Sequence, residues 1–177
     1  MAEPGILFEG DEEFDDLLSL NEGVLAQSDF PAKIEFPKPS EDEPEEIDPY
    51  INLDDPSFDL ERLEGADELV APPVIIIAYN YPLRDEFLFL HQSSDDRGFT
   101  RAELAESIAM TYQKIYREED AAVGPTGNLR VPRFNRAKSN GPYGIRNHHL
   151  QDLVLSGVSL DENSDLSFPT YELEIDS

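Results

Sequence analysis

Apolar residues follow recognisable patterns mainly in the second part of the chain. Residues 72–79 open with two prolines and continue as a short, mostly β-branched run, which predicts a buried strand. Residues 87–90 predict a second strand. The intervening residues 80–85 are enough to reverse the chain, so we expect the two strands to pair in antiparallel fashion.

The clearest local signal marks the start of a helix. Thr100 and Glu103 stand at the two polar positions of a capping box, and Phe99 and Leu104 are placed for the hydrophobic staple. Apolar residues then recur at helical spacing until Gly124, which predicts one amphipathic helix that covers the sheet. Its apolar stripe consists of Leu104, Ile108, Met110 or Tyr112, Ile115 and Tyr116. We interpret the two tyrosines as core residues with no ligand role.

The remaining elements have weaker patterns. Residues 150–160 predict either a strand or a short helix followed by a strand. Near the C-terminus, Tyr171, Leu173 and Ile175 alternate with acidic residues, which is typical of a half-exposed edge strand. Residues 71–177 are therefore expected to form a compact α+β domain, with a small, mostly antiparallel sheet covered by one main helix.

Residues 1–70 have a different composition. They contain 23 acidic and 3 basic side chains, so this segment carries 23 − 3 = 20 of the 26 net negative charges. Six prolines between residues 31 and 56 interrupt any long helix or central strand. A segment of this kind buries too little apolar surface to fold alone. We expect residues 1–70 to be a disordered acidic arm that precedes the domain.

Two apolar islands interrupt this arm. Each follows an aspartate that can cap a short helix, Asp11 in the first island and Asp55 in the second. Their apolar residues are Phe14, Leu17 and Leu18 in the first island and Phe58, Leu60 and Leu63 in the second. Helices of about two turns are marginal in water, so we expect them to form only when a partner groove accepts the apolar stripe.

These islands resemble the acidic–hydrophobic motifs of transcriptional activation segments. Residues 11–16 also resemble the acid-plus-aromatic segments by which histone chaperones hold core histones. Ser40, with the acidic residues 41–43 after it, resembles a substrate of the acidophilic kinase casein kinase 2, and a phosphate there would deepen the negative field. The resemblances imply a protein partner, basic or nuclear, such as transcription machinery or histones.

Cysteine content bears on the cellular location of the protein, and net charge bears on the kind of partner it can bind. The chain has no cysteine, which excludes disulfides, thiolate catalysis and thiolate zinc sites. With no signal peptide pattern, this favours an intracellular location, nucleus or cytoplasm. The apolar run at residues 70–78 is too short for a membrane helix. The chain has a net charge of −26, which repels nucleic acid and anionic lipid and attracts cationic proteins, so nucleic acid is not expected to bind through the acidic arm.

A basic loop at residues 121–146 is the exception to this acidity, because it contains no acidic residue. Its basic residues are Arg130, Arg133, Arg136, Lys138 and Arg146, with Phe134 and Tyr143 among them. Such a cluster is typical of sites for phosphates, bases or carboxylate-bearing peptides. Three interpretations stay open: a solvated loop, a contact with the acidic arm or an acidic protein, and an RNA or phosphate site. A nucleotide P-loop is excluded, because no Gly-Lys-Ser/Thr follows residues 124–127.

Candidate catalytic residues are scarce. The histidines are His91, His148 and His149, and no metalloprotease or serine hydrolase motif occurs. Adjacent residues of a strand point to opposite faces, so His148 and His149 are poor joint metal ligands. We therefore expect no enzymatic activity, no cofactor and no metal site.

Together these patterns favour an adaptor or regulator whose acidic arm docks onto a protein partner. The alternative is a small RNA- or phosphate-binding domain that uses the basic loop, with the acidic arm occupying that loop as an autoinhibitory mimic of nucleic acid.

Overall fold

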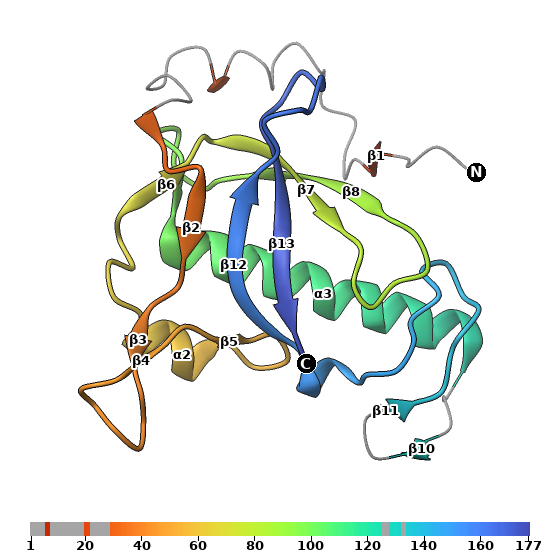
Figure 1. The fold of residues 1–177 in the computed structure, drawn as a ribbon. Coiled ribbons are helices and arrows are strands. Elements are labelled where there is room, and N and C mark those ends of the chain that lie inside the picture. Colours follow the sequence, from red (N-terminus) through yellow and green to blue (C-terminus); the bar gives the residue numbers. More distant parts are fainter. Residues whose placement is uncertain (1–5, 8–19, 22–28, 125–127, 132–133) are drawn as a thin grey trace.

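A computed structural model describes residues 6–7, 20–21, 29–124, 128–131 and 134–177 (Figure 1). For residues 6–7, 128–131 and 134, only the backbone is described. No helix within these ranges combines the length and the apolar composition needed to cross a membrane.

The centre of the fold is the predicted strand pair. Strands β7 (Val74–Tyr79) and β8 (Phe87–Gln92) pair in antiparallel fashion, with Ile77 opposite Phe89. All six residues of β7 are buried. This confirms the antiparallel pairing, and the run of β-branched residues is explained because both faces of β7 are covered.

The described strands form one main sheet of mixed direction, in the order β1-β8-β7-β13-β12-β2, with β5 also pairing with β12. The other strands of this sheet are β1 (Ile6–Leu7), β2 (Lys33–Glu35), β5 (Ile51–Asn52), β12 (Val154–Leu160) and β13 (Thr170–Asp176). β1 runs parallel to β8 and β13 runs parallel to β7, whereas the other pairs are antiparallel. The predicted mixture of helix and sheet, with one main helix packing on the sheet, is confirmed.

The C-terminal strand differs from the prediction. β13 is a central strand between β7 and β12, so its assignment as an edge strand was wrong. The alternation itself is present, because Tyr171 is buried in the core while Glu172 is exposed. Period-two alternation shows that one face of a strand is polar but carries no information about its lateral neighbours.

Helix α3 (Arg101–Val123) begins and ends at the predicted residues. The Thr100 hydroxyl accepts a hydrogen bond from the Glu103 N–H at 3.2 Å, and Gly124 ends the helix with a φ of 75°. Only half of the predicted capping box forms, because the Glu103 carboxylate accepts the Ser94 N–H at 2.6 Å instead. Thr100 is also the last residue of β9 (Phe99–Thr100), and β9 pairs with β6 (Leu69–Ala71). The Glu103 side chain instead contacts the loop that precedes β9.

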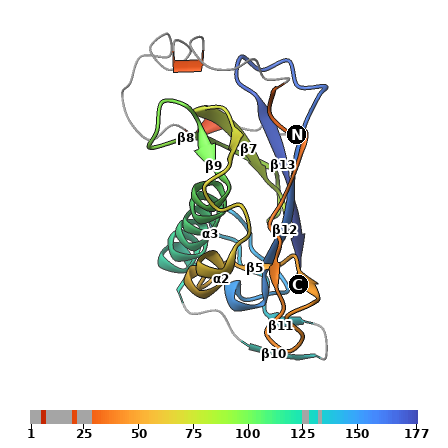
Figure 2. The same cartoon turned by 90° about the vertical axis from the view of Figure 1, so that its left-hand side faces the viewer.

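The sheet has an apolar cluster on each face. α3 packs on one face, and Figure 2 shows α2 (Ser57–Arg62) on that same side. Residues of β7 alternate between the two clusters: Ile75, Ile77 and Tyr79 belong to the helix side. The opposite cluster consists of Val74, Ile76, Ala78, Leu88 and Phe168, with Leu20 and Leu90 packed against it. We call this second cluster the outer face.

Residues 29–70 differ from the predicted disordered arm. Their strands β2 and β5 pair with β12, and Ile34, Phe36, Ile51 and Leu53 are buried in the core. The remaining elements here are the small pair β3 (Lys38–Pro39) and β4 (Ile47–Asp48), followed by α2. The acidic residues of this segment lie mainly at exposed positions between these short elements. Because they dominate the average composition, the segment looks too polar to fold, although single apolar residues are placed where they can enter the core. Residues 29–70 therefore pack together with the elements that follow residue 71.

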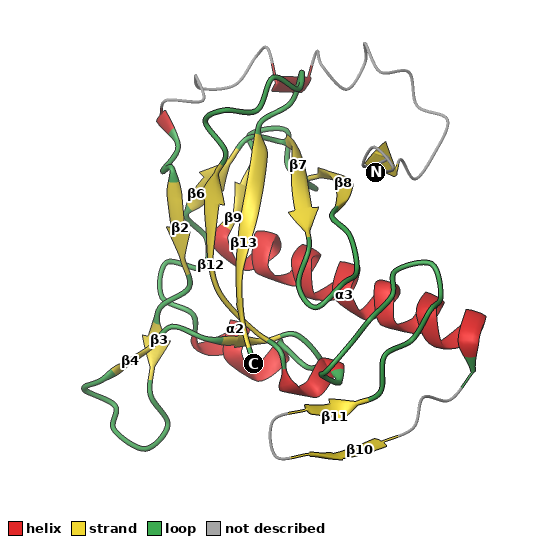
Figure 3. Ribbon diagram, turned by 45° about the vertical axis from the view of Figure 1, so that its right-hand side comes forward, coloured by secondary structure: helices red, strands yellow, loops and turns green. Residues whose placement is uncertain are grey.

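The segment between α3 and β12 forms one end of the molecule. It contains the pair β10 (Asn128–Val131) and β11 (Phe134–Arg136), which extends below the sheet in Figure 3. A one-turn helix, η2 (Leu150–Asp152), then leads into β12. Of the two alternatives for residues 150–160, the short helix followed by a strand is the correct one.

Candidate docking site at the outer edge of the sheet

Strand β8 offers a partly used edge for strand addition. One side pairs with β7 along its whole length, and the other side pairs with β1 through Ile6 opposite Leu88 and Leu7 opposite Phe89. Within the part of the chain that the structure describes, no strand pairs with residues 90–92 on this outer side. An unpaired row of backbone donors and acceptors is a template for an extended peptide.

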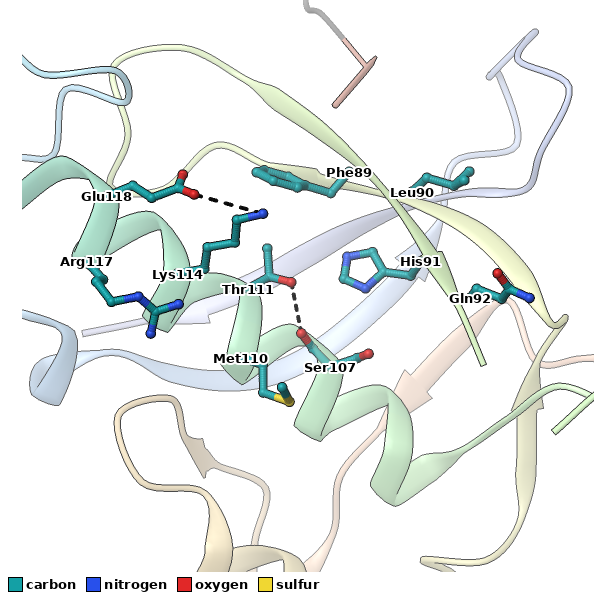
Figure 4. A pocket seen from close by; sticks show the side chains of 10 residues that line it. All are labelled: Phe89, Leu90, His91, Gln92, Ser107, Met110, Thr111, Lys114, Arg117 and Glu118. Carbon is teal, nitrogen blue, oxygen red and sulfur yellow. Dashed lines mark hydrogen bonds and ion pairs between the residues drawn. The ribbon is translucent and has the colours of Figure 1, made fainter. Parts of the chain in front are cut away.

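A groove of about 430 Å³ lies beside this edge, between β8 and α3 (Figure 4). The described residues that line it come from these two elements: Phe89, Leu90, His91 and Gln92 from β8, and Ser107, Met110, Thr111, Lys114, Arg117 and Glu118 from α3. Met110 is 61% exposed, so of the two residues predicted as alternatives for one position of the apolar stripe, Met110 or Tyr112, the buried one is Tyr112. A strand edge beside a helix provides backbone hydrogen bonds on one wall and side-chain pockets on the other.

The groove carries a local positive charge in a strongly acidic molecule. Lys114 and Arg117 line it together with one carboxylate, Glu118, so the titratable lining sums to 2 − 1 = +1 when His91 is neutral. The Lys114 Nζ lies 3.9 Å from the Glu118 Oε1. On a chain of net charge −26, a positive groove favours a ligand that brings a carboxylate.

His91 at the base of the groove is uncharged near neutral pH. Burial lowers its pKa to about 4, because an imidazolium there would lose its hydration. Its Nε2 lies 3.0 Å from the hydroxyl of Tyr79, and burial raises the pKa of that hydroxyl far above the usual value. His91 therefore acts as a neutral hydrogen-bonding residue of the core, not as a charged group of the groove.

A second contact of the N-terminal segment lies on the outer face. The Asn21 carboxamide donates to the Val74 carbonyl at 2.8 Å and accepts the Val74 N–H at 2.9 Å. Leu20 packs against the outer-face cluster. Asn21 thereby satisfies both backbone groups of Val74, as a neighbouring strand residue would.

The contacts at residues 6–7 and 20–21 flank the first apolar island. Phe14, Leu17 and Leu18 lie outside the described residues. The structure therefore fixes two points of the N-terminal segment on the domain, one on each side of the motif that the sequence identifies.

The second island is integrated into the domain. Leu63 is buried in the core and Leu60 packs against it, whereas Phe58 is 55% exposed. The Arg62 guanidinium lies 5.1 Å from the centre of the Phe58 ring. Phe58 is the most exposed of the three apolar residues of this island, because Leu60 and Leu63 face the domain.

Ser40, the predicted phosphorylation site, directly follows β3 in the connection to β4. It is half-buried, and its backbone N–H donates to the Glu46 carbonyl at 2.9 Å, while Glu41, Asp42 and Glu43 are exposed. The predicted acidic consensus is thus presented at the surface next to a hydroxyl that is only partly accessible.

The basic loop does not form one open cluster. Arg136 is 2% exposed, its Nη2 donates to Asp120 Oδ1 at 2.7 Å, and its guanidinium lies 5.2 Å from the Tyr116 ring centre. Lys138 and Arg146 are exposed. The side chains of Arg130 and Arg133 lie outside the described residues. Arg136 is therefore already paired within the chain, with an acidic residue that precedes the loop in sequence.

A buried carboxylate that the sequence analysis did not identify organises the same loop. Glu119 is fully buried and accepts four hydrogen bonds of 2.7–3.1 Å. The donors are the Ser139 hydroxyl and the N–H groups of Gly141, Tyr143 and Gly144. Burial raises the pKa of Glu119, but these hydrogen bonds together outweigh it and leave the pKa below its ordinary value. A Cβ at Gly141 would lie 2.7 Å from this carboxylate, so glycine is required there.

The described residues contain no grouping of three or more histidines and carboxylates suited to a metal ion. His148 and His149 lie just before η2, not in a strand, and the His149 N–H donates to Asp152 Oδ2 at 3.0 Å. Among the described residues, His91 and Glu119 are buried titratable groups that take part in packing and hydrogen bonding.

Comparison of the chain with protein-family models, with curated proteins and with solved structures gave no match.

Proposed function

We propose that this protein is an adaptor or regulator, in the nucleus or the cytoplasm, whose N-terminal acidic–apolar segment docks onto a protein partner. The observation that supports this most strongly is the pair of contacts at residues 6–7 and 20–21. They hold the two ends of the segment on the domain and leave residues 8–19 between them.

Both contacts are small enough to be replaced. β1 pairs through only two residues, and a strand of that length adds little stability by itself. The Asn21 carboxamide makes two hydrogen bonds, each of which contributes about 1 kcal/mol net. A partner that offers an apolar groove can therefore compete with the domain for this segment.

The composition of the segment defines the chemistry of the partner. Residues 8–19 contain six acidic and no basic side chains, together with Phe14, Leu17 and Leu18. Each of these three can contribute about 1.5–3 kcal/mol when fully buried. The matching surface is an apolar groove with a basic rim, where charge speeds association and the apolar residues determine affinity.

The test is a crosslinking pull-down from the native cell, with the full-length chain as bait. Replacing Phe14, Leu17 and Leu18 together by alanine should abolish capture of the main partner. The matched control, Asp15→Asn with Asp16→Asn, should retain that partner but associate more slowly at low salt, as measured by stopped flow. Retention of the partner by the triple variant would contradict the proposal.

A parallel variant separates this function from the RNA or phosphate alternative. Lys138→Ala with Arg146→Ala removes exposed cations of the basic loop and leaves the Arg136–Asp120 pair intact. If this variant loses the partner and the triple alanine variant keeps it, the basic loop is the binding site. We favour the N-terminal segment, because the buried Arg136 is already paired.

A further inference from the structure

The groove between β8 and α3 can be assigned an occupant, and this assignment is independent of the proposed partner. It is based on the register in which β1 pairs with β8. In a parallel pair, successive residues of one strand lie beside successive residues of the other, and Ile6 lies opposite Leu88 while Leu7 lies opposite Phe89. Continuing this register by three residues brings positions 8, 9 and 10 beside Leu90, His91 and Gln92 of the outer edge.

The two faces of β8 at these positions differ in chemistry. Leu90 packs on the outer face with its apolar cluster. His91 lies on the opposite side, where its ring stacks 5.9 Å from Tyr79 and lines the groove. Side chains alternate along a strand, so position 8 belongs to the apolar outer face and position 9 to the groove.

The sequence of the chain matches this alternation. Position 8 is Phe8, which suits the apolar outer face, and position 9 is Glu9, which suits a groove lined by Lys114 and Arg117. In the same register, Gly10 would follow beside Gln92, the exposed last residue of β8. A single-residue slip would exchange the two faces and place Phe8 among the basic groups and Glu9 against leucine.

We propose that the β8–α3 groove is a docking site for an extended segment with a carboxylate at its second position, and that residues 8–10 of this chain are its occupant. Phe8, Glu9 and Gly10 lie outside the described residues, so the assignment rests on their sequence and on the described groove. The ligand class is an extended peptide with apolar–acidic alternation, held by backbone hydrogen bonds to β8 and by a carboxylate contact with Lys114, whose side chain points toward β8 in Figure 4. Arg117 adds to the positive charge of the lining.

The lack of native cysteine makes this register directly testable. Phe8→Cys with Leu90→Cys puts two thiols at neighbouring positions of paired strands, close enough to form a disulfide under mild oxidation. Phe8→Cys with Gln92→Cys is out of register by two residues, and Phe8→Cys with Ser57→Cys reaches to α2. We expect the first pair to form an intramolecular disulfide much faster than either control, as measured by non-reducing electrophoresis and peptide mass spectrometry.

The carboxylate contact is tested in the Phe8→Cys, Leu90→Cys background. Glu9→Lys or Lys114→Glu should each slow disulfide formation about threefold, and the two reversals together should restore it. Glu12→Lys is the matched control for a change in net charge and should leave the rate of the cysteine pair nearly unchanged. Circular dichroism of each variant shows whether the fold is retained.

Three results would overturn the proposal. Equal rates for the Leu90, Gln92 and Ser57 pairs would show that position 8 has no fixed register. Disulfides formed only between molecules would assign the groove to a second copy. A fast Leu90 pair that is indifferent to charge reversal at both Glu9 and Lys114 would remove the carboxylate recognition.

Discussion

The two faces of the central strands are covered in different ways. The helix side is closed by α3, which contributes seven buried residues to the core cluster, and by core residues from several strands of the sheet. The outer face has a small cluster, covered in the described chain by Phe168 and by Leu20 of the N-terminal segment. Figure 2 shows how the helices gather on one side of the sheet. One face therefore carries most of the apolar burial.

This difference separates stability from binding. Removing α3 would expose a large part of the core, and no partner groove can compensate for that loss. Removing residues 20–21 would expose only a few side chains and free the two backbone groups of Val74. Contacts of low local stability are the ones that proteins exchange during binding, so we expect substitutions on the two faces to have separable effects.

The largest effect is expected on the helix side. Tyr112 is fully buried, packs edge-on against Tyr79 at 5.2 Å, and donates its hydroxyl to the Tyr81 carbonyl at 2.8 Å. Tyr112→Ala should lower the free energy of unfolding by about 4 kcal/mol, because it leaves a large cavity. Denaturant unfolding measures this change. Tyr112→Phe keeps the ring and should cost only about 1 kcal/mol; an equal loss in both variants would contradict the packing explanation.

The second effect concerns the end of α3. Glu119→Gln keeps the shape of the side chain but turns one acceptor oxygen into a donor that faces backbone N–H groups, so we expect a loss of about 3 kcal/mol. The pKa of Glu119 is lowered in the folded protein, so its contribution is fully present above the ordinary value of 4.5 and is lost as pH falls through the folded pKa.

The stability difference between wild type and Glu119→Gln should accordingly shrink in acid, as measured by urea unfolding from pH 7 to pH 3. Glu118→Gln is the matched control on the neighbouring residue, whose carboxylate contacts the Tyr143 hydroxyl and the Lys114 ammonium. It should cost less and leave the loop intact. A pH-independent difference for Glu119→Gln would show that the carboxylate charge is not what holds the loop.

The third prediction tests His91, which borders both the core and the groove. Its pKa is lowered to about 4 in the folded protein, whereas the unfolded chain titrates near 6.5. As pH falls below 6.5, the unfolded state binds a proton that the folded state does not bind, so stability decreases until the folded pKa is reached. Between pH 6.5 and pH 5 this amounts to about 2 kcal/mol. His91→Gln should remove that part of the pH dependence, and an unchanged slope would contradict it.

Elements specified by local sequence were predictable. The β7–β8 pair follows from a β-branched run, a short connection and a second apolar run, and α3 follows from the capping residues Thr100 and Glu103 and from Gly124. Each of these signals acts within a few residues, where steric and hydrogen-bonding preferences are decided without the rest of the fold.

Features that depend on distant pairing were not predictable. β13 is central because β7 lies on one side of it and β12 on the other, and its own alternation is the same in either position. Residues 29–70 pack because β12 offers an edge to β2 and β5, which average charge cannot reveal. The core residues of this segment, such as Ile34 and Ile51, are isolated among polar neighbours.

The charge pairing of the basic loop was likewise not predictable from the sequence. The absence of acidic residues in 121–146 suggested an uncompensated cluster, yet Asp120 and Glu119 lie immediately before that window and interact with it. A carboxylate at the end of a helix is ordinary in sequence. Only the folded loop shows that Glu119 accepts hydrogen bonds from residues more than twenty positions away. The available signal was the two glycines: a Cβ at Gly141 would lie 2.7 Å from the Glu119 carboxylate, and Gly144 has a φ of 68°.

The smallest stability effect is expected on the outer face. Leu20→Ala and Asn21→Ala should each lower the free energy of unfolding by about 1 kcal/mol, since Leu20 is only half-buried and Asn21 makes two neutral hydrogen bonds. The local effect should be larger, because Val74 loses the partner of its N–H. Native-state hydrogen exchange should show faster exchange at the Val74 amide, with little change at Ile77.

Asn21→Asp keeps an acceptor for the Val74 N–H and loses the donor to its carbonyl, so its Val74 amide should stay protected. If Asn21→Ala instead accelerated exchange across all of β7, the outer contact would be part of the global core, and the two faces would not differ in the way the packing indicates.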